Sequence, residues 1–189
     1  MAGVIIDIGT GDGSFALRLA KDYPDRYIIG IDPNHQALAK TSLKSNVSES
    51  KDRLANLVFV LASIEDLPAV LDGVANQVFI NFPWAGLMQK LLSGDAGVWA
   101  CLSRICQIGA FIEIVISYDP SHDGKIGLPV VDEHYIHGQL APALQSVGLQ
   151  VTSFTELSSE DIKNYPSSWG KKLAHGRPRS FYHLRVQRV

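Results

Sequence analysis

The stretch Val4-Ile5-Ile6-Asp7-Ile8 is followed at once by Gly9-Thr10-Gly11-Asp12-Gly13. The first part is apolar and β-branched, as in a buried strand, and a helical spacing of apolar residues begins at Phe15. A strand, a glycine turn and a helix open a nucleotide-binding α/β unit. Glycine lets the backbone pass close to a ligand, where a Cβ would clash, and the first N–H groups of the helix point to the same place. We therefore expect a ligand site at residues 9–13.

The spacing of the glycines indicates which ligand the turn binds. A dinucleotide fingerprint has the pattern G-x-G-x-x-G, with phosphate at the start of the helix. Here Gly13 comes one residue early, Ser14 holds the expected position, and Asp12 lies inside the turn, where it would repel a pyrophosphate. A ligand with a positive centre and no phosphate suits this turn better. S-adenosylmethionine (SAM), which carries an ammonium and a sulfonium, is such a ligand.

An acid at the end of the next apolar stretch supports the same ligand. Asp32 follows Tyr27-Ile28-Ile29-Gly30-Ile31 and lies about 20 residues after the turn, where a carboxylate accepts both hydroxyls of a ribose. The turn and this acid together resemble the motifs of class I SAM-dependent methyltransferases. A generic tight turn with an N-capping Asp is the alternative, but two cues at the right spacing favour a SAM site.

The composition indicates one globular domain. The chain has 189 residues, of which 46% are hydrophobic, so we expect a single methyltransferase domain over residues 1–189. No apolar stretch is long enough to span a membrane, and the first strand begins at Val4, which leaves no room for a signal peptide. The only cysteines, Cys101 and Cys106, are too few for a disulfide framework and fit a reducing cytoplasm.

The charge is unevenly distributed along the chain. The net charge is −2, but residues 162–189 contain no Asp or Glu and carry Lys163, Lys171, Lys172, Arg177, Arg179, Arg185 and Arg188. We interpret this basic end as a face for a polyanion such as RNA, because its charges bracket aromatic residues and glycines. A solvated charged surface is the alternative.

Strand-like and helix-like stretches alternate along the chain. We predict strands at residues 4–8, 27–32, 57–61, 77–80, 110–116, 149–154 and 180–186. We predict helices at residues 14–22, from 33 or 34 onward, at 86–108 with a break near 94–97, at 132–147 and near 160. This order predicts an α/β, Rossmann-like fold of the class I methyltransferase type. It has a seven-stranded, mostly parallel sheet with helices on both faces and a C-terminal antiparallel strand.

Two tryptophans lie in loops that should meet at one edge of the sheet. Trp84 ends the stretch Asn81-Phe82-Pro83-Trp84 after the fourth strand, and Trp169 lies in the long connection before the last strand. Two indoles that face each other could hold a flat base taken out of its stack. The alternative is that each is a core or lid residue. The stretch that begins at Asn81 also resembles the Asn-Pro-Pro-aromatic motif of amino-methylating enzymes, with Phe82 in place of the first proline.

Three motifs together resemble one family over nearly the whole chain. They are Asp7-Ile8-Gly9-Thr10-Gly11-Asp12-Gly13, Phe82-Pro83-Trp84, and Ser167-Ser168-Trp169 followed by Arg177-Pro178-Arg179-Ser180-Phe181. The family is the Kam/Npm family of aminoglycoside-resistance 16S rRNA (adenine(1408)-N(1))-methyltransferases. The resemblance implies methyl transfer from SAM to N1 of the decoding-site adenine of 16S rRNA in the 30S subunit. We also expect a monomer that uses no metal and no membrane.

The resemblance assigns roles to individual residues. Trp84 and Trp169 would stack on the flipped adenine, and Pro83 would position its edge. SAM would be held by Asp7, Gly9, Thr10, Gly11, Asp12, Asp32, Pro33, Ile64, Glu65, Asn81, Phe82 and Ser167. Among these, Ile64 would pack on the adenine ring of SAM and Glu65, or Asp66, would accept from its amine, although capping of a short turn explains these acids equally well. RNA would be contacted by Lys44, Lys51, Arg53, Lys171, Lys172, Arg177 and Arg179.

Two features depart from the family pattern. Family members carry an N-terminal β-hairpin that helps them dock on ribosomal RNA, whereas this sequence starts three residues before its first strand. Either the sequence is a truncated piece or this member lacks that contact. Asn81 stands where the members have an aliphatic residue. Three alternatives therefore stay open: an enzyme that methylates the exocyclic amine of adenine in RNA or DNA, an enzyme that acts on a small molecule, and a catalytically silent SAM- or RNA-binding module.

Overall fold

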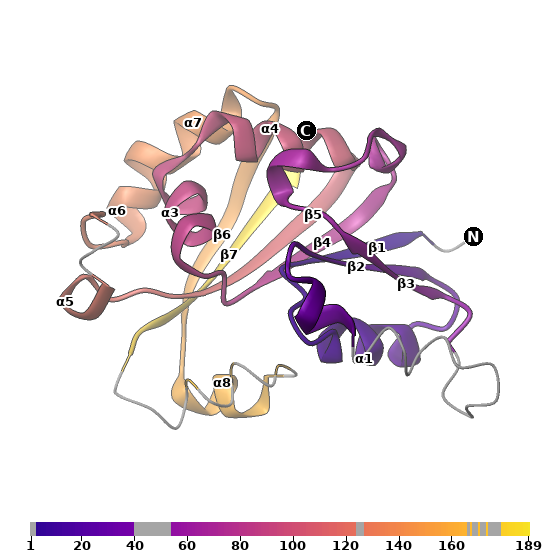
Figure 1. Cartoon of the computed structure of the whole chain (residues 1–189). Helices are drawn as coiled ribbons and strands as arrows, with labels where there is room; N and C mark the ends of the chain where they lie inside the picture. Colours follow the sequence, from indigo (N-terminus) through magenta and orange to yellow (C-terminus); the bar gives the residue numbers. More distant parts are fainter. Residues whose placement is uncertain are drawn as a thin grey trace.

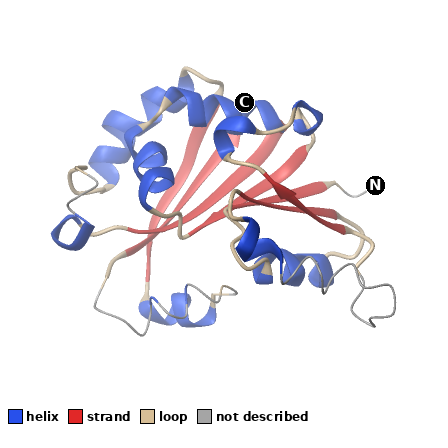
Figure 2. Cartoon of the chain, viewed as in Figure 1, coloured by secondary structure: helices blue, strands red, loops and turns tan. Residues whose placement is uncertain are grey.

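The computed structural model describes residues 3–39, 54–123, 127–165, 167, 170, 173 and 179–189, and its centre is one seven-stranded sheet. The strands are β1 (Val4–Ile8), β2 (Tyr27–Asp32), β3 (Leu57–Leu61), β4 (Ala75–Asn81), β5 (Cys106–Ser117), β6 (Leu149–Leu157) and β7 (Phe181–Arg188). Figure 2 shows the strands in red, side by side in this sheet, and their order is β3-β2-β1-β4-β5-β7-β6. Neighbouring strands from β3 to β5 are parallel, whereas β7 is antiparallel to both β5 and β6. The predicted fold is therefore confirmed.

Helices cover both faces of the sheet. They are α1 (Ser14–Asp22), α3 (Ala85–Ser93), α4 (Ala96–Ile105), α5 (Pro120–Asp123), α6 (Glu133–Tyr135), α7 (Ala141–Gln145) and α8 (Ser159–Asn164). Shorter turns are η1 (Ile64–Asp66), η2 (Ala69–Leu71) and the π-helical η4 (Ile136–Leu140). In Figure 1, α3, α4, α6 and α7 lie above the sheet, and α1 and α8 lie below it. No helix of the described part of the chain is long and apolar enough to cross a membrane.

The burial of β1 explains how the sheet carries a core on each face. Ile6 and Ile8 belong to the larger apolar cluster, which includes residues of α3 and α4, whereas Ile5 belongs to the cluster formed with α1. All three side chains are buried. Successive strand residues point to opposite faces, so an uninterrupted apolar run suits a strand that is covered on both sides.

One predicted helix boundary is wrong. The helix expected over residues 86–108 is broken where predicted, at Gly94, which has a φ of 73° and ends α3. Asp95 then caps α4 by accepting a hydrogen bond from the Val98 N–H. However, α4 ends at residue 105, and residues 106–109 belong to β5. The sheet extends β5 beyond its apolar stretch, which the local pattern of residues does not indicate.

The helix predicted over residues 132–147 is present as α6, η4 and α7. Its middle is π-helical rather than α-helical. Pro142, near the start of α7, has no N–H to donate to the preceding turn, which accounts for a local change in the hydrogen-bond pattern. The helix ends before Gly148, which has a φ of 72°, as expected for a glycine at a helix C-terminus.

Three strands end at the same edge and define where a site can form. The strands β1, β2 and β4 are parallel neighbours, with Ile8, Asp32 and Asn81 as their last residues. The chain leaves β1 for α1 on one face of the sheet and leaves β4 for α3 on the other (Figure 1). A crevice opens between strands whose connections diverge in this way, and ligands of open α/β sheets bind there.

Candidate functional site

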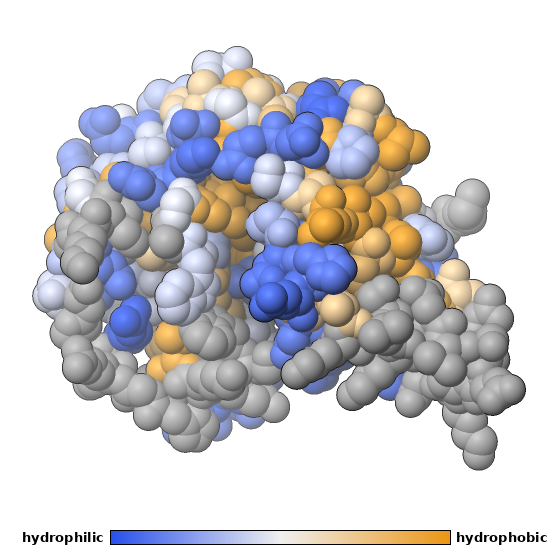
Figure 3. Space-filling model, in the orientation of Figure 1, coloured by the Kyte–Doolittle hydropathy of each residue, from blue (hydrophilic) through white to orange (hydrophobic). Residues whose placement is uncertain are grey.

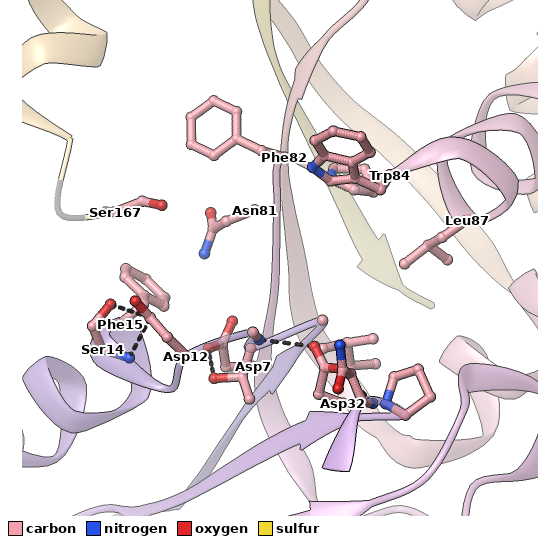
Figure 4. Close-up of a pocket in the computed structure, with 17 residues that line it drawn as sticks. Asp7, Asp12, Ser14, Phe15, Asp32, Asn81, Phe82, Trp84, Leu87 and Ser167 are labelled. Carbon is pink, nitrogen blue, oxygen red and sulfur yellow. Dashed lines mark hydrogen bonds between the residues drawn. The ribbon is translucent and has the colours of Figure 1, made fainter. Parts of the chain in front are cut away.

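A cavity of about 610 Å³ lies at the carboxyl ends of β1, β2 and β4 (Figure 4). The lining residues are Asp7, Ile8, Gly9, Thr10, Gly11, Asp12, Ser14, Phe15, Asp32, Pro33, Asn34, Asn81, Phe82, Pro83, Trp84, Leu87 and Ser167. On the face drawn in Figure 3, the surface is hollowed, with hydrophobic residues inside the hollow and hydrophilic residues around it. A cavity of this volume can enclose a small organic ligand.

The glycine turn forms the floor of the cavity. Gly9, Gly11 and Gly13 have φ values of 72°, 56° and 72°, which side chains of L-residues rarely adopt. The N–H groups of Gly9 and Thr10 both donate to the carbonyl of Ile31, at 2.8 and 3.0 Å, and so tie the turn to the end of β2. A Cβ added at Gly9 would have no atom within 4 Å. Within the protein, Gly9 is therefore needed for its backbone conformation and not to avoid a clash.

The carboxylate of Asp32 is held in place by backbone N–H groups. Its Oδ2 accepts from the Gly11 N–H at 2.8 Å, and its Oδ1 accepts from the Asn34 N–H at 2.8 Å. Each carboxylate oxygen can accept a further bond. Asp32 therefore lines the cavity in a fixed orientation and can still accept from the hydroxyls of a ligand, which is the arrangement that a ribose requires.

Asp7 is the most deeply enclosed acid of the cavity wall. It is 2% exposed, and its Oδ2 accepts from the Thr10 hydroxyl at 2.5 Å. Burial raises the pKa of Asp7 to about 7; the bond from Thr10 opposes this shift, and the nearby Asp32 and Asp12 add to it. Among the described residues, no Lys or Arg lines the cavity. A wall with three carboxylates and no cation favours a positively charged ligand.

The chain turns sharply where β4 ends. Phe82 has a φ of 51°, the one positive value found for a residue other than glycine in the described chain. This conformation is strained for a bulky side chain, and such strain is retained only where the surroundings hold it. Its N–H donates to the carbonyl of Val115 at 2.7 Å, and its ring is packed edge-on against Tyr165 and Phe181. The Phe82 ring is thus anchored by these contacts, while its backbone redirects the chain at the cavity wall.

Trp84 lies at the rim of the cavity as a result of this turn. It directly precedes α3 and is 65% exposed, although it also lines the cavity. In Figure 4 its indole stands on the same side of the cavity as Leu87. An exposed indole beside a ligand cavity can stack on a flat group that enters from solvent. Trp169, the other member of the predicted pair, lies outside the described residues.

Among the described residues of the connection from α8 to β7, Ser167 lines the cavity. Ser167 is 9% exposed, and its N–H donates to the Tyr165 carbonyl at 2.8 Å. Its hydroxyl accepts from the Gly170 N–H at 3.3 Å. Gly170 itself packs on Phe82, because an added Cβ would lie 2.8 Å from the ring. Ser167 and Gly170 thus lie against the end of β4, and the contact of Ser167 with the ligand stays a prediction.

Two of the predicted cofactor residues do not line the cavity. Ile64 is 6% exposed and belongs to the larger apolar cluster, on the face of the sheet covered by α3 and α4. Glu65 forms an ion pair with Lys90 of α3, at 2.7 Å, and its hydrogen bond with Lys90 lowers the pKa of Glu65. Their contacts with the adenine of a cofactor stay a prediction.

Sequence reasoning missed several residues that line the cavity. They are Ile8, Ser14, Phe15, Asn34 and Leu87. All five lie within three residues of a predicted site residue, so the motifs themselves were a signal for them. Leu87 lies three residues after Trp84, in the first turn of α3.

The described cations of the basic end contact acidic side chains or backbone carbonyls of the fold. Lys163 pairs with Glu160 at 3.6 Å, Arg179 with Asp123 at 3.4 Å, and Arg185 with Glu113 at 3.0 Å. Arg188 donates to the carbonyls of Ser103 and Cys106. The other predicted RNA contacts, which are Lys44, Lys51, Arg53, Lys171, Lys172 and Arg177, lie outside the described residues. The predicted basic face therefore stays a prediction.

Comparison with known proteins gives one consistent result. The chain matches, over residues 1–188, the family model described as "NpmA: 16S rRNA (adenine(1408)-N(1))-methyltransferase". It is 34% identical over 186 residues to the 16S rRNA (adenine(1408)-N(1))-methyltransferase of Escherichia coli, covering 96% of this chain and 85% of that protein. It is 26% identical to the protein of the same name from Streptoalloteichus tenebrarius, covering 93% of this chain and 82% of that protein.

Solved structures show the same similarity in three dimensions. A mutant of the 16S rRNA (adenine(1408)-N(1))-methyltransferase from Catenulisporales acidiphilia, solved with the cosubstrate SAM, has a TM-score of 0.89 and 30% identity. The match covers 100% of this chain and 86% of that chain. The aminoglycoside resistance methyltransferase NpmB1 has a TM-score of 0.83 and 33% identity, with 100% of this chain and 88% of that chain covered.

Proposed function

The chain belongs to the family of 16S rRNA (adenine(1408)-N(1))-methyltransferases, and we propose that it transfers the methyl group of SAM to N1 of adenine 1408 of 16S rRNA in the 30S subunit. A methyl group on this decoding-site base would protect the ribosome against aminoglycosides. The observation that carries the proposal is the acid-lined cavity with an exposed tryptophan at its rim, at the edge of the sheet where β4 ends.

The residues of the cavity fit SAM as its cofactor. Asp32 presents an oriented carboxylate for the ribose hydroxyls, and the glycine turn leaves room for the chain that links the ribose to the amino acid part. Asp7 and Asp12 supply negative charge for the ammonium and the sulfonium. Bound SAM supplies a methyl group on a positively charged sulfur, so that group needs no further activation.

The chain's own residues would mainly hold and align the target base. Trp84 would stack on the flipped adenine from one side and Trp169 from the other, and each such contact stabilises a bound base by about 1–3 kcal/mol. Pro83 would position the edge of the base, and Ser167 would close the cavity beside it. Adenine N1 attacks with its own lone pair and loses no proton. We therefore expect alignment in a site that excludes water to be the main catalytic contribution, and no general base.

The RNA would be held by cations around the cavity. Arg179 lies two residues before β7, at this edge of the sheet. Lys171, Lys172 and Arg177 precede it in the chain. Lys44, Lys51 and Arg53 would add contacts from the segment between β2 and β3. The enzyme would act as a monomer, without a metal, in the cytoplasm where ribosomes are assembled and used.

Methyl transfer from radiolabelled SAM tests the proposal. Purified 30S subunits, naked 16S rRNA and a mixture of proteins are incubated in parallel with the enzyme. We expect label in the 30S sample, and we expect cells of a susceptible bacterium that express the chain to tolerate kanamycin and apramycin. Transfer to protein alone, or no transfer to any RNA, would contradict the proposal.

A further inference from the structure

Asn81, the last residue of β4, carries a buried donor that the fold does not satisfy. Its side chain lines the cavity, and its Nδ2 atom is enclosed with no hydrogen-bond partner among the described residues. A buried N–H group without a partner is costly, so one that is retained beside a ligand cavity points to a partner supplied by the ligand. The Nδ2 atom is shielded by its neighbours, but the Asn81 residue borders the cavity, so we look for the partner among the groups of a ligand held there.

The orientation of this amide is determined by Tyr165, which follows α8. The Tyr165 hydroxyl donates to Asn81 Oδ1 at 2.6 Å. Burial is the main cause that raises the pKa of Tyr165, so the hydroxyl keeps its proton and acts as a donor. With Oδ1 occupied, the amide must turn its NH₂ the other way. In Figure 4 the nitrogen of Asn81 points toward the part of the wall made by Asp12 and Phe15.

Tyr165 is itself held by other residues of the cavity wall. Its ring stacks on Phe15, with centroids 6.3 Å apart and planes at 10°, and packs edge-on against Phe82 at 5.7 Å. Its carbonyl accepts from the N–H of Ser167. One residue thus links α1, the end of β4 and Ser167. Because two ring contacts and one backbone hydrogen bond hold Tyr165, the hydroxyl has little freedom to release Asn81.

We propose that Tyr165 and Asn81 form a clamp for the α-carboxylate of the cofactor's amino acid part, with Asn81 Nδ2 as the donor and Tyr165 as the positioning residue. This inference rests on the proposed function, because it takes SAM as the ligand. The charged side chains of the wall explain the choice of group. Asp7, Asp12 and Asp32 are acceptors that suit the cations and the ribose hydroxyls. Among the described residues, no lining Lys or Arg is available for the one anionic group of SAM.

Two nucleosides distinguish binding at the clamp from binding in the rest of the cavity. S-adenosylhomocysteine carries the amino acid part, whereas 5′-methylthioadenosine lacks it and keeps the adenine and the ribose. Binding of each is measured by calorimetry to the wild type and to Asn81→Leu, Asn81→Asp and Tyr165→Phe. The Tyr165→Phe variant keeps the ring contacts and removes only the hydroxyl. Tyr135→Phe is the matched control, because it removes a tyrosine hydroxyl that donates to the Leu92 carbonyl at 3.0 Å away from the cavity.

We expect Asn81→Leu to weaken the binding of S-adenosylhomocysteine roughly tenfold or more, since a hydrogen bond to a charged group is lost. Tyr165→Phe should weaken it several-fold, and Asn81→Asp most of all, because a carboxylate would then face a carboxylate. Methylthioadenosine should bind all variants like the wild type, and Tyr135→Phe should change neither ligand.

Three results would overturn the clamp. Asn81→Asp could bind S-adenosylhomocysteine as well as or better than the wild type, which would assign a cation to this position. Binding of both nucleosides could weaken equally, which would mean that Asn81 and Tyr165 only support the structure. Binding of neither nucleoside could weaken in any variant, which would mean that the pair does not hold the ligand. If the wild type bound neither nucleoside, the proposed function itself would fail, and this result differs from all three.

Discussion

The two walls of the cavity are built in different ways. The cofactor wall, formed by residues 7–15 and 32–34, holds its functional groups by short hydrogen bonds between neighbouring segments, such as those from Gly11 and Asn34 to Asp32. The target wall, formed by residues 82–84, depends on a strained Phe82 and on packing between elements far apart in the chain. Its most exposed side chain is Trp84.

This difference indicates that cofactor binding and target binding are separable. A change on the cofactor wall should alter the affinity for SAM and leave the affinity for the 30S subunit nearly unchanged. A change on the target wall should do the reverse. The following expectations test that separation, from the largest effect to the smallest.

Replacing the exposed indole should have the largest effect. We expect Trp84→Ala to lower methyl transfer to 30S subunits about 100-fold, because stacking on a base is worth about 1–3 kcal/mol and alignment is lost with it. The Kd for SAM, measured by calorimetry, should stay within about twofold. Tyr27→Ala, which removes a 41% exposed aromatic residue at the other end of the sheet, is the control and should leave transfer unchanged. If Trp84→Ala kept the turnover of the wild type, the indole would have no part in the mechanism.

The cofactor wall should give the opposite pattern. We expect Asp32→Asn to weaken SAM binding by roughly 10- to 100-fold, because a charged acceptor of the ribose hydroxyls is lost. Binding of the variant to 30S subunits, measured by sedimentation, should match that of the wild type. If Asp32→Asn and Trp84→Ala both reduced SAM binding, the two walls would not be separable.

The buried acid should make cofactor binding depend on pH. Asp7 has a pKa of about 7, and a cationic ligand binds better to its ionised form, so SAM affinity should rise roughly tenfold from pH 6 to pH 8 and then level off. The turnover number at saturating SAM should change little, since no general base is used. Asp7→Asn should bind SAM weakly and without this dependence. An equal slope in Asp7→Asn would assign the titration to another group.

The same acid should affect the stability of the protein without ligand. Because burial raises the Asp7 pKa above its ordinary value of 3.8, the folded chain binds more protons than the unfolded chain between about pH 4 and pH 7. The contribution of Asp7 to the free energy of unfolding should therefore fall as pH rises through that window. Thermal unfolding of the wild type and of Asp7→Asn at several pH values measures this contribution. If the stabilities of the two proteins changed with pH in parallel, the expectation would be contradicted.

The smallest effect concerns the ion pair of Arg179 and Asp123. If Arg179 contacts a phosphate of the target, Arg179→Gln should weaken 30S binding several-fold and lower the salt slope by about 1. Asp123→Asn releases the arginine and should strengthen binding slightly. Two variants that leave the salt slope unchanged would mean that the ion pair only joins α5 to the start of β7.

Local motifs of the sequence predicted the cofactor wall well because its geometry is encoded within a few residues. The glycine turn needs positive φ values, and Asp32 ends an apolar strand at a fixed distance from it. The target wall and the clamp were harder to predict. Phe82 is held in its strained conformation by elements far along the chain, and the bond from Tyr165 to Asn81 joins positions 84 residues apart. Likewise, Arg179 has its acidic partner 56 residues away, so the charge count of the basic end did not reveal which cations are paired.

Mapping the methylated atom tests the central claim most directly. Wild-type enzyme and Trp84→Ala are incubated with 30S subunits and SAM, and the 16S rRNA is digested and analysed by mass spectrometry. We predict N1-methyladenosine at position 1408 with the wild type and its near absence with Trp84→Ala. A methyl group on the exocyclic amine, on another nucleotide, or at equal levels in both samples would contradict the account.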